Sequence, residues 1–131
     1  ATEFEHRPYG TELQLCQRYF ESTAPIGIAP ANGVAYSDRL IMCAYATGSC
    51  ALTGRFLIPK RAAPTITYYG GQTVAGSLWG VFVNPSWSAS TTMAAGNTTA
   101  ASFDITLNKT GSFAIAGCYV CSGGWSASSE L

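Results

Sequence analysis

The chain has 131 residues, about one domain's worth, with 7 lysines and arginines against 7 aspartates and glutamates. Only 11% of its residues are charged, where about 25% is typical. This composition excludes the basic stripe of a nucleic-acid binder and the polybasic segment of a membrane-surface protein. No apolar run reaches the roughly eighteen residues of a spanning helix, so we expect no membrane insertion. Such sparse charge predicts that copies of the chain cover part of the surface.

Residues 1–21 form a lead segment that is richer in charge than the rest of the chain. Within it, residues 11–20 have a helical pattern, with Leu13, Cys16 and Phe20 on one face. A helix this short is marginal in isolation and must pack on something. We therefore expect a short helix at an interface between copies of the chain. The residues expected near that interface are Leu13, Leu15, Cys16 and Phe20.

Residues 22–131 alternate between short apolar runs and turn residues, which predicts strands. The expected strands are at 34–46, 52–58, 65–69, 78–83, 102–107 and 112–121, with a last short strand at Trp125 after a Gly123-Gly124 turn. In the cleanest alternation, Phe103, Ile105 and Leu107 point inward and Asp104 outward. Roughly eight strands at this spacing predict an all-β fold, an antiparallel β-sandwich resembling a jelly roll, with a short N-terminal helix.

The five cysteines are Cys16, Cys43, Cys50, Cys118 and Cys121. An odd number fits poorly with a disulfide framework, and a four-cysteine zinc site would need a second close pair. The C-x-x-C at 118–121 lies in an expected strand, where positions three apart face opposite sides. We therefore predict five free thiols, no bound metal and no cofactor.

Catalytic residue types are scarce. His6 is the only histidine, and it lies in the charged lead. The acids of the body are Asp38, Asp104 and Glu130, and their spacing brings no two of them together across a cleft. We expect that the chain is not an enzyme.

Two tryptophans are candidates for ligand binding. Trp87 lies in a polar, loop-like segment beside Asn84, Ser86 and Ser88, and Trp125 follows a double glycine. An exposed ring among hydrogen-bonding groups can stack on the C–H face of a sugar while its neighbours bind hydroxyls. The alternative is that both rings pack on the core or on a neighbouring subunit.

The opening run FEHRPYGTELQLCQRYF at residues 4–20 resembles a segment of phage and prophage tail-fibre and other virion structural proteins, where a similar run opens the last domain of a long chain. RAAPTIT at 61–67 and the terminal EL are similar to further elements of that family. The sequence departs from the family pattern at Glu3 and at Ser128-Ser129. The resemblance implies a trimeric virion surface protein and supplies no catalytic residues.

Together these features predict the carboxy-terminal receptor-binding domain of a trimeric tail-fibre or tailspike-like protein. Its expected partners are the fibre chain that precedes it and a bacterial cell-surface polysaccharide. We expect assembly in the host cytoplasm and a final position on the virion, at the tail or the capsid surface. Three weak sites on one trimer would gain apparent affinity by avidity. The alternatives are a trimerisation, capping or capsid-decoration domain without an external ligand and, ranked last, a glycan-processing enzyme.

Overall fold

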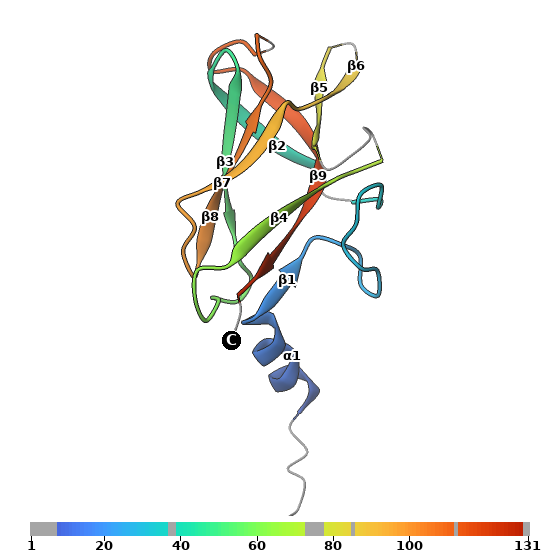
Figure 1. The fold of residues 1–131 in the computed structure, drawn as a ribbon, viewed down its shortest axis with the longest axis vertical. Coiled ribbons are helices and arrows are strands. Elements are labelled where there is room, and N and C mark those ends of the chain that lie inside the picture. Colours follow the sequence, from blue (N-terminus) through green and yellow to red (C-terminus); the bar gives the residue numbers. More distant parts are fainter. Residues whose placement is uncertain (1–7, 37–38, 73–77, 85, 112, 130–131) are drawn as a thin grey trace, which may run out of the picture.

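The computed structural model describes residues 8–36, 39–72, 78–84, 86–111 and 113–129, which form strands and a short helix near the amino terminus (Figure 1). The elements are α1 (Tyr9–Gln17), β1 (Phe20–Ser22), β2 (Arg39–Ala46), β3 (Ser49–Arg55), β4 (Thr65–Gly70), β5 (Gly80–Val83), β6 (Ser86–Ala89), β7 (Thr92–Gly96), β8 (Ser102–Asn108) and β9 (Cys118–Ser128). All paired strands among them are antiparallel. The prediction of an all-β fold with a short N-terminal helix is confirmed.

The sheet is organised around β9, its longest strand. The strand order is β6-β5-β9-β2-β3-β8-β7, and β1 and β4 also pair with β9. The first part of β9 pairs with β2 and β5, and its second part pairs with β1 and β4. One strand thus belongs to two sets of partners, and the sheet curls around its inner face (Figure 1).

A double glycine lies in the middle of β9, where we expected a turn. The prediction of a turn was wrong, because the two glycines leave room for aromatic rings to pack against the strand. A Cβ added to Gly123 would lie 2.2 Å from Trp79 Cδ1, and one added to Gly124 would lie 2.1 Å from Tyr36 Cε1. The indole Nε1 of Trp79 also donates a hydrogen bond of 3.0 Å to the carbonyl of Gly124. The strand therefore continues through both glycines, with one ring against each of them.

The core lies on the inner face of the sheet. Phe103, Ile105 and Leu107 of β8 are buried there, as their alternation predicted, and the core also takes in residues of β2, β5 and β9. Asp104 points to the other face, where it accepts hydrogen bonds from Thr53 and Asn97. Period-2 alternation thus identified both faces of β8 correctly.

The lead segment is tied to the sheet by a buried ion pair. Lys60 Nζ lies 2.6 Å from Glu21 Oε2, and it also donates a hydrogen bond to the carbonyl of Gln17 at the end of α1. The Glu21 carboxylate accepts the backbone N–H of Leu57. The expected division between residues 21 and 22 falls within β1, which pairs with β9. The end of the lead segment is therefore part of the sheet.

Candidate functional site

Trp87 lies on the outer face of an edge hairpin and not in a loop. It belongs to β6, which pairs with β5 so that Trp87 is directly opposite Phe82. The two rings meet edge to face, with centroids 5.6 Å apart and planes at 64°. Val81, the neighbour of Phe82, points into the core, so Phe82 and Trp87 point away from it. The indole is half-buried.

A cation lies over the indole. The guanidinium carbon of Arg39 is 5.7 Å from the centroid of the Trp87 ring, within the usual range of a cation–π contact. Arg39 begins β2, two strands away from β5, and its side chain is exposed. It makes no hydrogen bond or ion pair within the described part of the chain. The guanidinium thus lies beside an aromatic ring on the exposed face of the sheet.

The outer face continues from Trp87 as a row of apolar side chains. Phe82 is 37% exposed and Ile41 of β2 is 64% exposed. Ile41 is paired with Val120 of β9, and continuing the register of Val81 and Cys121 by one residue places Phe82 beside Val120. We call Trp87, Phe82, Ile41 and Arg39 the outer row.

The structure separates Trp87 from two of its predicted neighbours. Ser86 and Ser88 alternate with Trp87 along β6, so they point to the opposite face of the hairpin. Asn84 is exposed in the turn between β5 and β6. The polar group beside the ring is Arg39, which our sequence analysis did not place there. No local pattern could have indicated it, because the contact depends on the register of four strands, β2, β9, β5 and β6.

Trp125 occupies a different environment, and the surface position that we expected is not found. It is 8% exposed and belongs to the core. Its ring packs edge to face on Phe103 at 5.0 Å and on Phe56 at 5.9 Å between centroids. A ring held in this way cannot offer an open face to a sugar.

Trp125 does line a small pocket of about 260 Å³ on the inner side of the sheet. The hydroxyl of Thr23 is engaged there with the backbone of Trp125, and that of Thr53 donates to Asp104. Of the polar side chains that line the pocket, only Arg55 makes no hydrogen bond or ion pair within the described residues. The pocket is a weaker candidate than the outer row, because its aromatic ring, Trp125, is buried against Phe56 and Phe103.

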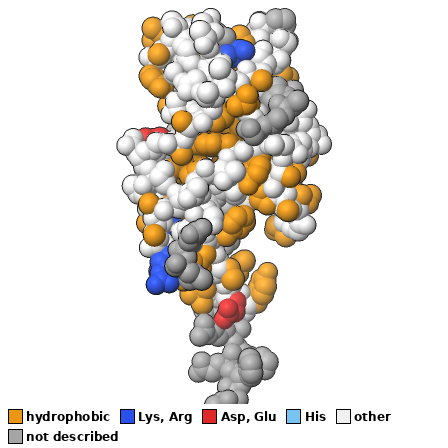
Figure 2. Space-filling view, viewed as in Figure 1, with side chains coloured by type: hydrophobic (Ala, Val, Ile, Leu, Met, Phe, Trp, Pro, Cys, Tyr) orange, Lys and Arg blue, Asp and Glu red, His pale blue; other side chains and the backbone are white. Residues whose placement is uncertain are grey.

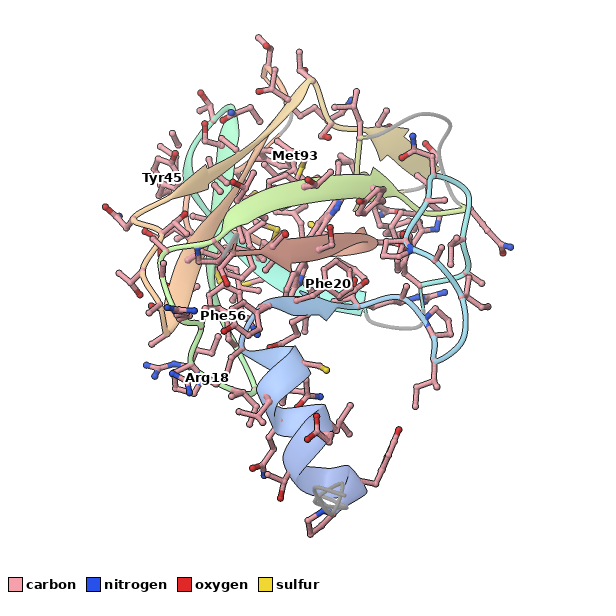
Figure 3. The ribbon with its side chains drawn as sticks, turned by 60° about the horizontal axis from the view of Figure 1, so that its bottom comes forward. Arg18, Phe20, Tyr45, Phe56 and Met93 are labelled. Carbon is pink, nitrogen blue, oxygen red and sulfur yellow. The ribbon has the colours of Figure 1, made fainter. Side chains whose placement is uncertain are left out.

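A second surface feature is an apolar groove of about 510 Å³ between the helix and the loop that follows β1. Hydrophobic side chains gather around both segments in Figure 2. Figure 3 shows Phe20 at the junction of helix and strand. We define the apolar groove by its large exposed hydrophobic side chains, which are Leu13, Phe20, Ile26, Ile28 and Leu57. Cys16 also lines it, whereas Leu15 does not.

The described residues are candidates for catalysis or metal binding only where acidic, histidine or cysteine side chains lie close together. The described parts of the chain hold no group of three or more histidine, cysteine, aspartate or glutamate side chains that could bind a metal ion. His6, Asp38 and Glu130 lie outside the described residues. Within these ranges no helix is both long and apolar enough to cross a membrane.

Comparison with known proteins finds no matching family model, no similar curated protein and no similar solved structure.

Proposed function

We propose that this chain is the receptor-binding domain of a trimeric phage fibre-like protein and that its outer row binds a bacterial surface glycan. The observation that carries the proposal is the half-exposed indole of Trp87 with the Arg39 guanidinium beside it. The resemblance of residues 4–20 to virion structural proteins supports a place on the virion.

The outer row has the chemistry that a sugar needs. Phe82 and Ile41 provide apolar surface for the C–H groups of further sugar units. The guanidinium of Arg39 can donate several hydrogen bonds to hydroxyl or carboxylate oxygens. The site would bind its ligand and leave it chemically unchanged. A shallow site of this kind is weak alone, and three copies on one particle compensate by avidity.

Removal of the Trp87 ring is expected to weaken glycan binding about tenfold, the equivalent of roughly 1.4 kcal/mol of lost contact energy. The oligosaccharide would first be identified with the wild-type domain on an array of bacterial surface glycans. Its monovalent affinity for Trp87→Ala would then be measured by titration calorimetry, which avoids the effect of avidity. We expect Arg39→Ala to weaken binding as well.

Tyr45→Ala is the matched control. Tyr45 is also an exposed aromatic residue of the outer face, but it lies on β2 and outside the outer row. It should bind the oligosaccharide as the wild type does. Equal affinities for the wild type and Trp87→Ala would show that the site lies elsewhere.

The apolar groove supports the trimer. Leu13 and Phe20, both expected at the subunit interface, line it together with Ile26 and Leu57. Exposed apolar patches of this kind mark interaction surfaces. The same observation favours the second candidate function, a trimerisation or capping domain without an external ligand. If the protein forms a stable trimer but binds no glycan on the array, the second function is the correct one.

A charge placed in the apolar groove is expected to dissociate the trimer. Ile26 and Leu57 are among the most exposed large hydrophobic residues, so Ile26→Glu and Leu57→Glu should leave the fold of each subunit intact. Light scattering should give a trimer mass for the wild type at micromolar concentration and a monomer mass for both variants. Ile115→Glu is the control, because it places the same charge at an exposed residue outside the groove. This variant should remain a trimer. A monomeric wild type would refute the trimer.

A further inference from the structure

Two exposed cysteines face each other across neighbouring strands. Cys43 is on β2 and Cys118 is the first residue of β9, and the register of the two strands makes them direct partners. Their sulfur atoms are 2.7 Å apart, and either thiol can donate to the other. Both side chains are on the outer face of the sheet, open to solvent.

The backbone around this pair has the geometry that a disulfide needs. The N–H of Ala44 donates to the carbonyl of Gly117, which makes Cys43 and Cys118 a non-hydrogen-bonded pair of the antiparallel ladder. In such pairs the Cα atoms are about 4.5 Å apart, within the range of about 4.4–6.8 Å that disulfides span. Since an S–S bond is about 2.05 Å long, the sulfurs need only a small rotation of the side chains to reach it.

The other cysteines lack this arrangement. Cys50 and Cys121 are fully buried, which keeps a dissolved oxidant away from their sulfur atoms. Cys121 is three residues from Cys118 but on the opposite face of β9, as the sequence predicted. Cys16 is exposed on α1, where it lines the apolar groove.

We propose that Cys43 and Cys118 are a redox-active dithiol that peroxide oxidises to an intramolecular disulfide. In the first step, one sulfur attacks a peroxide oxygen and breaks the O–O bond, which leaves a sulfenic acid and releases water. In the second step, the other sulfur displaces the sulfenic hydroxyl, forms the S–S bond and releases a second water. Each sulfur loses one electron, and peroxide accepts both.

The cross-link joins the middle of β2 to the start of β9 and spans 75 positions of the chain. A disulfide that closes so long a loop restricts the unfolded chain strongly and stabilises the folded one. The protein would thus hold five thiols in a reducing cytoplasm and become more stable after release into an oxidising medium. The link also fixes β2, the strand that carries Arg39 and Ile41.

The test compares the whole chain before and after treatment with hydrogen peroxide. Thiol titration of the denatured protein should fall from five groups to three, and peptide mapping without reductant should find Cys43 joined to Cys118. The melting temperature should rise on the order of 10 °C and return on reduction with dithiothreitol. Cys16→Ser should show the same cross-link and the same rise.

Cys43→Ser and Cys118→Ser should show neither, and both are exposed positions at which serine leaves the fold intact. Five thiols remaining after oxidation would overturn the proposal. So would a disulfide between Cys16 residues of two chains, or conversion of Cys43 to a sulfinic acid without cross-linking.

Discussion

Gly123→Ala is expected to destabilise the domain by about 3 kcal/mol or more, because the new methyl group would overlap the Trp79 ring. Trp79 is fully buried and is held by its hydrogen bond to Gly124, so its ring cannot swing away without losing that bond and opening a void. The melting temperature of Gly123→Ala should therefore fall by roughly 10 °C or more.

Gly96→Ala provides the control for this substitution. Gly96 also lies in a strand, and its added Cβ would be 3.7 Å from the nearest atom, the Cβ of Asp104, which is ordinary contact. We expect its melting temperature to change little. A double variant tests the cause directly. If the cost comes from the Trp79 ring, Gly123→Ala should cost less when Trp79 is already replaced by leucine. Similar losses for Gly96→Ala and Gly123→Ala would show that strand glycines are weak points in general.

The double glycine also shows where sequence patterns mislead. Gly-Gly is a typical turn dipeptide, and the local sequence of residues 122–124 favours that interpretation. The rings that require the glycines are Tyr36 and Trp79, which are distant in the chain. Contact with a distant ring therefore decided the local conformation. In β8, by contrast, the alternation of Phe103, Ile105 and Leu107 was sufficient to predict the strand and its buried face, because every second residue of a strand points to the same side.

The candidate site was predicted only in part. Trp87 was identified from the contrast between its ring and its polar neighbours, and the structure places it on the outer face. Ser86 and Ser88 were wrongly grouped with it, because the segment was interpreted as a loop. In the strand that it forms, these two side chains point to the face opposite Trp87. Arg39 meets Trp87 only because four strands, β2, β9, β5 and β6, pair in the correct register.

The burial of Lys60 was not predictable from its neighbourhood either. It follows Pro59 and precedes Arg61, a setting typical of an exposed turn. In the structure it is 3% exposed and contacts both the Glu21 carboxylate and the face of the Phe56 ring, 5.0 Å from its centroid. The charge is tolerated inside because each of its neighbours compensates part of the lost hydration.

Removal of Glu21 is expected to cost about 3–5 kcal/mol of unfolding free energy, because it leaves the ammonium of Lys60 buried without a counter-ion. In Glu21→Leu, Lys60 would retain only the Gln17 carbonyl and the Phe56 ring as partners. Lys60→Met should cost less, about 3 kcal/mol, since the carboxylate keeps the two hydrogen bonds that it accepts from the Leu57 N–H. Urea denaturation of both variants measures the difference.

The double variant Glu21→Leu/Lys60→Met separates the cost of a buried unpaired charge from the value of the pair itself. An apolar pair of similar volume avoids the desolvation of both ions, so the double variant should be more stable than Glu21→Leu alone and should approach the wild type. Lys109→Met is the control, because the Lys109 ammonium donates to the Ala89 carbonyl at an exposed site, and its loss should change stability by less than about 0.5 kcal/mol. If the losses of unfolding free energy in the two single variants add up in the double variant, Glu21 and Lys60 stabilise the domain independently. The contact of α1 and β1 with residues 56–60 would then not depend on the ion pair.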